Sequence, residues 1–278
     1  MKNYLMISGA AGGLGSALVV ECAQRGYDLY LTDIDEKGAE FARFIAETYQ
    51  IEARYRACDL TSGPARQQLF DQLKAEGSNF WGLLNVAGLD NEGAFLEKTR
   101  EQILSVIQVD VEATVDMTRA ILDLRAQDRR FMLVNVCSLA AFFPMPYKAT
   151  YSASKRFLVE FSRAIREEIR DFGSVTALCP GGLPTTPASL RKIKAQGLWG
   201  KLTVMDTRTV ARKTMDYALR GKAVYIPGFL NGVLQGLGAV LPPALVAKYV
   251  GKRWQTAQKE SLAGGSKKKL ETTFSDKY

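Results

Sequence analysis

Tyr151 and Lys155 lie four residues apart in the segment Tyr-Ser-Ala-Ser-Lys. On a helix, residues at this spacing share one face, so a tyrosine hydroxyl and a lysine ammonium can enter the same site. A nearby ammonium stabilises a tyrosinate and lowers the pKa of the hydroxyl toward neutral pH, and a helix N-terminus acts in the same direction. The pair therefore predicts a general acid/base for an alcohol–ketone reaction, although the same spacing also occurs in ordinary surface pairs.

A glycine-rich segment lies between a strand-like and a helix-like stretch near the start of the chain. Glycine lets the backbone approach a pyrophosphate, and the N-terminus of the next helix offers free N–H groups and the positive end of a dipole. The expected dinucleotide-binding residues of this segment are Gly9, Ala11, Gly12, Gly13, Leu14 and Gly15. Asp33 follows the next strand, where a carboxylate hydrogen-bonds the adenosine ribose of NAD and repels the 2′-phosphate of NADP. Alternatively, Asp33 only caps the helix that follows it.

Several other chemistries are excluded by composition. The chain of 278 residues contains no histidine, which removes Ser-His-Asp and Cys-His nucleophilic mechanisms as well as histidine metal sites. The four cysteines are scattered and form no CxxC pair, so no metal site is expected. We expect reduced, mostly buried thiols in a cytoplasmic protein, and the first residues leave no room for a signal peptide.

The net charge of +8 is concentrated at the C-terminal end of the chain. From Lys248 onward, eight basic residues stand against three acidic ones, so the rest of the chain is close to balanced. Such a tail is usually only solvated, and a nucleic-acid partner is not expected. Weak peripheral contact of this region with a membrane is the alternative, since no apolar run is long enough to span one.

Strand-like and helix-like segments alternate along the chain. The expected strands are 4–8, 29–32, 53–57, 82–86, 131–136, 175–179 and 223–226, and the expected helices are 14–26, 36–49, 62–76, 99–127, 150–171 and 207–220. Repeated βα units require right-handed crossovers. They predict an α/β fold of the Rossmann type, a doubly wound parallel sheet with helices on both faces.

We expect a single domain over residues 1–258, because neither a repeat nor a linker interrupts it. Within this domain, about 184–206 is expected to form a mobile lid, and about 229–258 to form short apolar helices. Residues 259–278 are expected to be a flexible basic tail.

The motifs of the chain, in their order, resemble those of the short-chain dehydrogenase/reductase family from Tyr4 to about Ile226. Ser8 to Gly15 is similar to the TGxxxGxG loop of that family, with Ser8 in place of threonine. Ser138, which follows a strand and precedes Tyr151 by thirteen residues, stands at the catalytic spacing of the family. Three further segments complete the resemblance: Asp59-Leu60 (the adenine-contacting pair), Asn85-Val86-Ala87-Gly88 (NNAG, with valine for the second asparagine) and Pro180-Gly181-Gly182-Leu183-Pro184-Thr185 (PGxVxT).

This resemblance implies roles for individual residues. Tyr151 would exchange a proton with the substrate oxygen, and Ser138 would orient that oxygen. Lys155 would lower the pKa of Tyr151 and bind the nicotinamide ribose. The backbone of Leu183 and the side chain of Thr185 would hold the carboxamide of the nicotinamide. The implied cofactor-contacting residues outside the glycine loop are Asp33, Asp59, Leu60, Asn85, Ala87, Gly88, Tyr151, Lys155, Pro180, Gly181, Leu183 and Thr185.

One position departs from the family pattern. Asp110 stands where the family usually has a catalytic asparagine, whose main-chain carbonyl is thought to hold a water molecule linked to the lysine. An aspartate keeps that carbonyl but adds a negative charge near Lys155. Activity is therefore expected, with an altered proton relay.

The cofactor and the substrate follow from the residues around the motifs. Members of the family that prefer NADP usually carry Arg or Lys where this chain has Gly12 and Ile34, so NAD is expected. Aromatic and apolar residues near the cleft, Phe142, Phe143, Tyr147 and Trp199 among them, are either ordinary core or the wall of a hydrophobic site. The second interpretation favours a ketone or alcohol such as a hydroxysteroid or lipid.

Two other functions stay open at this point. One is an acyl-chain ketoreductase of lipid or polyketide synthesis, which would normally use NADPH. The other is a catalytically inactive protein that senses NAD(H) or acts as a scaffold, which the change at Asp110 would favour. The family resemblance also implies a homodimer or homotetramer, in which the helices at 99–127 and 150–171 commonly pair.

Overall fold

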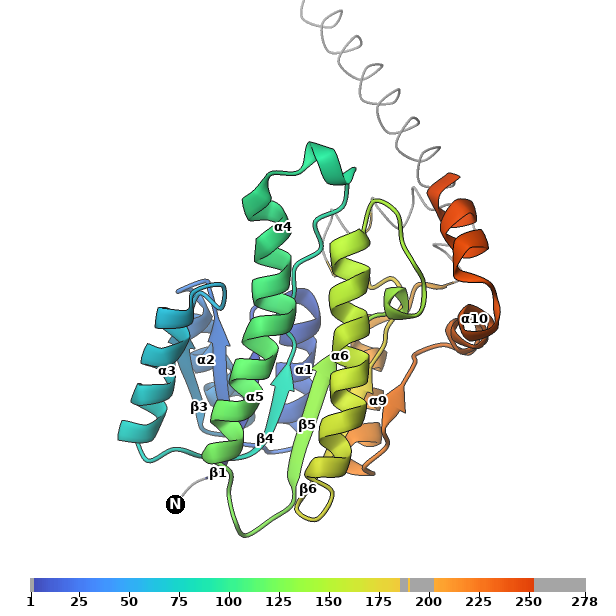
Figure 1. The fold of residues 1–278 in the computed structure, drawn as a ribbon. Coiled ribbons are helices and arrows are strands. Elements are labelled where there is room, and N and C mark those ends of the chain that lie inside the picture. Colours follow the sequence, from blue (N-terminus) through green and yellow to red (C-terminus); the bar gives the residue numbers. More distant parts are fainter. Residues whose placement is uncertain (1–2, 186–189, 191–202, 253–278) are drawn as a thin grey trace, which may run out of the picture.

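The computed structural model describes residues 3–185, 190 and 203–252. Seven parallel strands form one sheet in the order β3-β2-β1-β4-β5-β6-β7 (Figure 1). The strands are β1 (Asn3–Ser8), β2 (Leu29–Asp33), β3 (Ala53–Ala57), β4 (Asn79–Asn85), β5 (Phe131–Val136), β6 (Gly173–Leu178) and β7 (Val224–Tyr225). The direction of winding reverses between β1 and β4, and ligands of open α/β sheets bind at the carboxyl ends of the strands beside such a point.

Helices cover both faces of the sheet, as expected for the Rossmann-type fold. They are α1 (Gly13–Gln24), α2 (Gly38–Tyr49), α3 (Gly63–Ala75), α4 (Arg100–Ile107), α5 (Thr114–Asp123), α6 (Ala149–Glu168) and α9 (Thr207–Leu219). In Figure 1, α3, α5 and α6 lie in front of the sheet, whereas α1, α2 and α9 lie behind it.

Alternation along the strands divides the core between these two layers. Leu5 and Ile7 of β1 pack with α1, α2 and α9 on one face, and Tyr4 and Met6 pack with α3 and α5 on the other. All four side chains are buried, because successive side chains of a strand point to opposite faces and both faces are covered. This explains why the central strands are continuous apolar runs in the sequence.

The helix expected over 99–127 is interrupted. α4 and α5 are joined by a π-helical segment, η2 (Gln108–Ala113), and the helical region ends at Asp123. Asp110 lies in this π segment. A π segment widens the turn and displaces the residues it contains, which is why such segments are frequent at functional sites.

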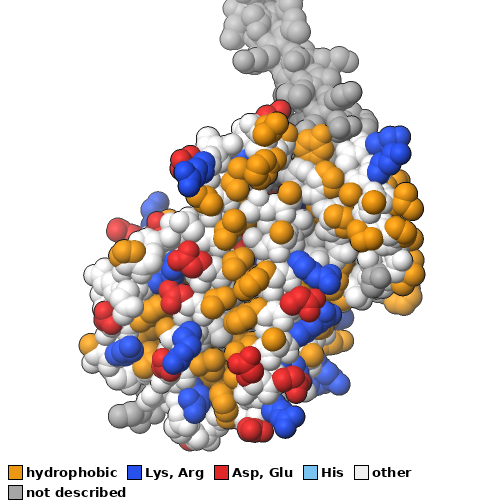
Figure 2. All heavy atoms as spheres, viewed as in Figure 1, with side chains coloured by type: hydrophobic (Ala, Val, Ile, Leu, Met, Phe, Trp, Pro, Cys, Tyr) orange, Lys and Arg blue, Asp and Glu red, His pale blue; other side chains and the backbone are white. Residues whose placement is uncertain are grey.

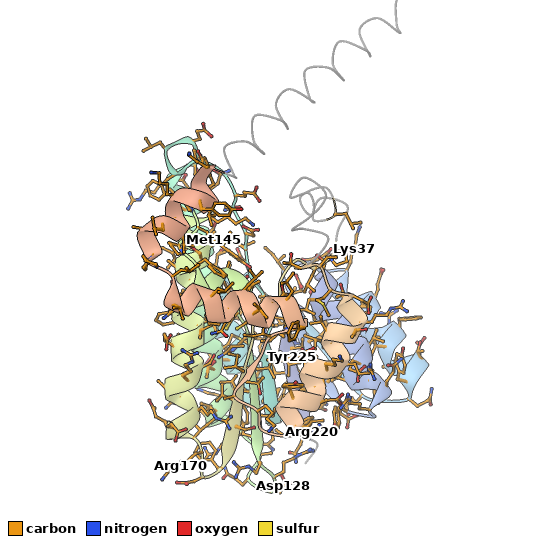
Figure 3. The ribbon with its side chains drawn as sticks, turned by 90° about the vertical axis from the view of Figure 1, so that its right-hand side faces the viewer. Lys37, Asp128, Met145, Arg170, Arg220 and Tyr225 are labelled. Atoms are coloured by element: carbon orange, nitrogen blue, oxygen red, sulfur yellow. The ribbon has the colours of Figure 1, made fainter. Side chains whose placement is uncertain are left out.

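The C-terminal part contains the two expected short helices. α10 (Phe229–Val240) is followed by a helix over 243–252, and a 3-10 turn, η3 (Leu139–Phe142), contacts α10. Figure 3 shows α10 crossing beside β7, with Tyr225 below it and Met145 near the following helix. None of the described helices is long and apolar enough to span a membrane. Most of the expected lid, 186–189 and 191–202, and the tail from 253 onward fall outside the described residues.

Candidate active site

The glycine loop lies between β1 and α1, at the reversal of the sheet. α1 begins at Gly13 after an extended Gly12, and no side chain caps its first turn. The first N–H groups of a helix have no partner within the helix, so the N-terminus of α1 is suited to bind an anionic group such as a pyrophosphate. The N-terminus of α1 therefore lies where the predicted pyrophosphate contact would be made.

Glycine is required in this loop by close contacts between backbones. Gly9 has a φ of +68°, and a Cβ atom there would lie 2.5 Å from the backbone nitrogen of Ala87. A Cβ atom on Gly15 would lie 1.9 Å from the carbonyl oxygen of Gly9. The loop is thereby closely packed against the end of β4, which brings the Ala87-Gly88 segment beside the helix N-terminus.

The turn after β6 reaches the same loop. A Cβ atom on Gly13 would lie 2.3 Å from Cβ of Thr185, so these two residues are in direct contact. Pro180 accepts a hydrogen bond at its carbonyl oxygen from the backbone nitrogen of Leu139 (2.8 Å), next to Ser138. A Cβ atom on Gly181 would lie 2.6 Å from the carbonyl oxygen of Thr203. The segment from Pro180 to Thr185 thus joins the glycine loop to the catalytic side of the site.

Asp33 is the last residue of β2, and its carboxylate is hydrogen-bonded to the glycine loop. Oδ2 accepts from the backbone nitrogen of Ala11 (2.8 Å), and Oδ1 accepts from that of Ile34 (2.7 Å). The side chain is partly exposed, and α2 begins only at Gly38. Asp33 therefore orients the loop and does not cap α2.

Two expected cofactor-contacting residues use their side chains internally. Asn85 is 4% exposed and donates from Nδ2 to Thr118 Oγ1 (3.0 Å) and Asn135 Oδ1 (2.9 Å). Its Nδ2 therefore ties β4 to β5 and α5, while its Oδ1 is buried without a hydrogen-bond partner among the described residues. Asp59 Oδ1 accepts from the backbone nitrogen and the hydroxyl of Thr61 (2.9 and 2.7 Å), so this carboxylate stabilises a turn, and Leu60 is buried behind it.

Ser138, Tyr151 and Lys155 meet beyond the end of β5. Ser138 precedes η3, where its Oγ accepts from the backbone nitrogen of Ala140 (3.1 Å). Tyr151 lies in the first turn of α6, and the nearby Ser138 side chain acts to lower the pKa of its hydroxyl. The ammonium of Lys155 lies 5.7 Å from the centroid of the Tyr151 ring and donates to the carbonyl oxygen of Val136 (3.1 Å). The structure therefore brings together the three residues that the sequence pattern selected.

Asp110 contacts Lys155 through its carboxylate. Asp110 Oδ2 lies 3.4 Å from Lys155 Nζ, and Oδ1 accepts from the backbone nitrogen of Leu89 (2.9 Å). A Cβ atom on Gly88 would lie 3.0 Å from Lys155 Nζ and 3.1 Å from Asp110 Oδ1, so the glycine leaves the space that this pair occupies. Both charged side chains are buried.

The pKa values of this pair follow from burial and from mutual attraction. Burial raises the pKa of Asp110, although Lys155 and the Leu89 N–H oppose this shift. Burial acts to lower the pKa of Lys155, but Asp110 and Tyr151 outweigh it, so the pKa of Lys155 lies above its ordinary value. Lys155 is accordingly held as an ammonium, with Asp110 as its principal counter-charge.

The expected lowering of the pKa of Tyr151 is wrong as a net direction. Burial raises this pKa, and Asp90 and Asp110 raise it further. Lys155 and the Ser138 side chain act in the expected direction but do not outweigh burial. The sequence pattern indicated Lys155 and the negative charge of Asp110, but neither the burial of Tyr151 nor the carboxylate of Asp90 could be predicted from it.

Lys148 is a further charged residue beside Tyr151, and sequence reasoning missed it. Its Nζ lies 5.5 Å from the Tyr151 ring centroid, 2.5 Å from Asp90 Oδ2 and 3.4 Å from Glu92 Oε2. Burial acts to lower its pKa, but Asp90 and the other negative groups raise it above the ordinary value. Its position three residues before Tyr151, at the N-cap of α6, was the available signal.

The residues present fit a nicotinamide dinucleotide. The uncapped helix N-terminus suits a pyrophosphate, the backbone cradle at Gly9, Gly13 and Gly15 leaves no space for side chains, and Asp33 stands at the end of β2. Among the described residues, no group of His, Cys, Asp or Glu could hold a metal ion. The four cysteines are buried and reduced.

Comparison with known proteins agrees with this geometry. A family model described as short chain dehydrogenase matches residues 3–195. The chain is 26% identical over 267 residues to human 17-beta-hydroxysteroid dehydrogenase 13, covering 94% of this chain and 86% of that protein. It is also 26% identical over 256 residues to the very-long-chain 3-oxoacyl-CoA reductase of Bos taurus, covering 89% and 78% of the two chains.

A solved structure shares the fold. The short-chain dehydrogenase from Sphingobium yanoikuyae in complex with NADPH superposes with a TM-score of 0.71 at 23% identity, covering 87% of this chain and 97% of that chain. At this identity the likeness establishes the arrangement of the elements.

Proposed function

The chain belongs to the short-chain dehydrogenase family, and from this membership we propose that it transfers hydride between NAD(H) and a hydrophobic secondary alcohol or ketone. As an oxidoreductase of this family it uses a nicotinamide cofactor. The observation that carries the proposal is the assembly of Ser138, Tyr151 and Lys155 at the end of β5, beside a glycine loop at the reversal of the sheet. The cofactor, when bound, supplies or accepts the hydride.

Four side chains would transfer the proton, orient the substrate oxygen and supply the charges of the site. The Tyr151 hydroxyl donates its proton to the substrate oxygen during reduction and accepts it back during oxidation. Ser138, which acts to lower the pKa of Tyr151, holds the same oxygen. Lys155 favours the tyrosinate electrostatically, and Asp110 keeps Lys155 protonated in a buried position.

The preference for NAD is supported by the charges around the end of β2. Asp33, Asp35 and Glu36 are acidic, and Ile34 is 66% exposed at a place where a cation would be needed to bind a 2′-phosphate. A 2′-phosphate here would face like charges. The Sphingobium protein binds NADPH, but it is only 23% identical to this chain, so its cofactor does not decide which cofactor this chain prefers.

A hydrophobic substrate is supported by the names of the relatives and by apolar residues beyond Ser138. Phe142 itself belongs to the core, in a cluster with Cys137 and Leu158, whereas Phe143 and Met145 are only partly buried. Trp199 falls outside the described residues. An acyl-chain ketone is the second candidate, because the bovine relative is a very-long-chain 3-oxoacyl-CoA reductase. The intact catalytic residues argue against an inactive sensor or scaffold.

We also propose that the chain forms a homo-oligomer through its long helices. Phe157 of α6 is 44% exposed and stacks on Phe161 at 6.0 Å, and Ile107 of α4 is 41% exposed. Exposed apolar residues on adjacent helices suit a helix–helix interface. Light scattering at micromolar concentration would identify a dimer or tetramer, and a monomer would refute this proposal.

The enzymatic proposal is tested by a substrate screen that follows the absorbance of NADH. Hydroxysteroids, long-chain secondary alcohols and 3-oxoacyl thioesters would each be presented with NAD(H) and with NADP(H). Turnover of a steroid or simple lipid alcohol supports the first candidate, and turnover of the thioester alone supports the second. Binding of NADH without turnover of any compound would favour the non-catalytic alternative.

A further inference from the structure

α10 and the helix over 243–252 present an apolar surface that the rest of the fold does not cover. The exposed residues of this surface, here called the α10 face, are Phe229, Val233, Leu237, Val240, Leu241, Leu245 and Tyr249. Phe229 and Val240 are 90% and 83% exposed. Their spacing of four, four and three residues along α10 places them in one stripe. Figure 2 shows hydrophobic side chains gathered over this part of the molecule.

The opposite side of α10 is anchored to the fold. Asn231 is buried and donates from Nδ2 to the carbonyl oxygens of Pro227 (2.6 Å) and Thr203 (3.2 Å). A Cβ atom on Gly238 would lie 2.7 Å from the ring of Phe143, so α10 packs closely on the η3 region. The helix is therefore held with its stripe facing outward.

The charge of this region has one sign. Neither aspartate nor glutamate occurs between Asp216 and Glu260, whereas this stretch contains Arg220, Lys222, Lys248, Lys252, Arg253 and Lys259. An apolar surface whose own segment of the chain, residues 217–259, carries only basic charges is complementary to the interface of a membrane that carries anionic lipids.

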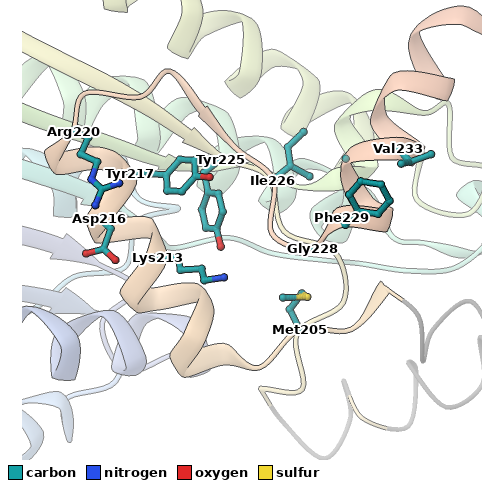
Figure 4. Close-up of a pocket in the computed structure, with 11 residues that line it drawn as sticks. Met205, Lys213, Asp216, Tyr217, Arg220, Tyr225, Ile226, Gly228, Phe229 and Val233 are labelled. Carbon is teal, nitrogen blue, oxygen red and sulfur yellow. The ribbon is translucent and has the colours of Figure 1, made fainter.

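A groove of about 760 Å³ borders the α10 face between α9, β7 and α10 (Figure 4). Lys213 and Arg220 line it together with Tyr217, and Phe229 and Val233 lie at its α10 side. The one carboxylate in its lining, Asp216, is paired with Arg25 at 2.8 Å. The groove therefore combines cationic and apolar side chains, as an anionic lipid headgroup and its chain require.

We propose that the α10 face docks this protein on anionic lipid surfaces, with α10 lying in the plane of the interface. The exposed apolar stripe of α10 and the basic residues that follow it in the chain suit an interfacial position. A second copy of the chain fits the same face less well, because symmetric contact would bring identical basic residues together. Lipid docking does not depend on the proposed enzymatic function. Only the consequence of docking, delivery of a hydrophobic substrate past η3, rests on that function.

The test is co-sedimentation of the full chain with phosphatidylcholine vesicles, with and without phosphatidylglycerol. We expect binding to the anionic vesicles that weakens as salt is added. Phe229→Asp should weaken this binding at least about tenfold, because it removes a large apolar side chain from the interface. Phe44→Asp, on an exposed phenylalanine of α2, is the matched control and should bind as the parent does.

The electrostatic part is tested by Lys248→Gln, which should weaken binding to anionic vesicles about fivefold. Lys74→Gln, at an exposed position of α3, should leave the binding unchanged. Melting temperatures of all four variants verify folding. Failure to bind anionic vesicles, equal binding of Phe229→Asp and Phe44→Asp, or a dimer that only Phe229→Asp dissociates would overturn the proposal. Since the assay contains neither cofactor nor substrate, a failure of the enzymatic proposal leaves its result unaffected.

Discussion

The carboxylate of Asp110 lies 3.4 Å from the ammonium of Lys155, and both groups are buried beside Tyr151. The family usually has an uncharged asparagine at this position. The pair replaces an amide by a full negative charge that holds the lysine in its protonated form and, at the same time, disfavours the tyrosinate. The Asp110 side chain therefore has two opposite effects on the same reaction: it keeps Lys155 charged, and it raises the pKa of Tyr151.

Asp110→Asn is expected to keep activity within about tenfold and to shift the pH profile of alcohol oxidation toward lower pH. Oxidation needs the tyrosinate, so its rate rises with pH through the pKa of Tyr151. Asp110 raises that pKa, and removing the charge lowers it. Asp116→Asn, on the neighbouring α5 and paired with Arg66, is the control and should leave the profile unchanged. A loss of more than about a hundredfold would show that the carboxylate is needed to keep Lys155 charged.

Lys148→Gln should shift the same profile in the opposite direction. Tyr151 raises the pKa of Lys148, and this coupling is reciprocal, so Lys148 lowers the pKa of Tyr151. Without the ammonium, Asp90 acts on Tyr151 uncompensated, and the oxidation limb should move to higher pH. The pH dependence of kcat/KM measures the effect. An unchanged limb, or a shift in the same direction as that of Asp110→Asn, would contradict the arrangement of charges described above.

Tyr151→Phe should lower turnover by a factor of about a hundred to ten thousand while NADH binding persists, because only the proton donor is lost. Tyr217→Phe, on α9 and outside the site, should turn over at the parental rate. Steady-state kinetics and fluorescence titration with NADH measure the two properties. Activity close to that of the parent in Tyr151→Phe would refute the assigned mechanism.

Asp33 should give a preference for NAD(H) over NADP(H) of about tenfold to a hundredfold, since losing a charged hydrogen bond costs about 1.5–3 kcal/mol. Asp33→Ala should reduce this preference, and the addition of Ile34→Arg should reverse it by supplying a partner for the phosphate. The measurement is kcat/KM with each cofactor. A parent enzyme that already favours NADPH would show that Asp33 serves only to hold Ala11 in the loop.

Gly9→Ala should abolish cofactor binding and destabilise the fold more than Gly26→Ala does. Both glycines have positive φ, +68° and +76°, so an alanine at either costs about 1–2 kcal/mol in backbone strain. Only at Gly9 would the new Cβ atom meet backbone, 2.5 Å from Ala87, whereas at Gly26 it meets nothing within 4 Å. Thermal unfolding and NADH titration compare the two variants. Equal destabilisation would mean that the loop can shift away from β4.

The sequence by itself determined the sheet, the glycine loop and the tyrosine–lysine pair. These features are local: buried parallel strands are continuous apolar runs, a helix N-terminus follows its glycines directly, and the spacing of Tyr151 and Lys155 is one helical turn. For the same reason the ends of most strands were predicted to within a few residues, while the helix over 99–127 was not seen to contain a π segment.

Only the tertiary structure decided the electrostatics of the site. Asp90 comes from a separate segment, and its effect on Tyr151, like the burial of that tyrosine, depends on distances and packing that no local pattern encodes. Asn85, likewise, turned inward because Asn135 and Thr118 lie beside it in the folded chain. Charges in a poorly solvated site interact strongly over several ångströms. The pKa of Tyr151 therefore depends on charged groups that only the complete fold brings together.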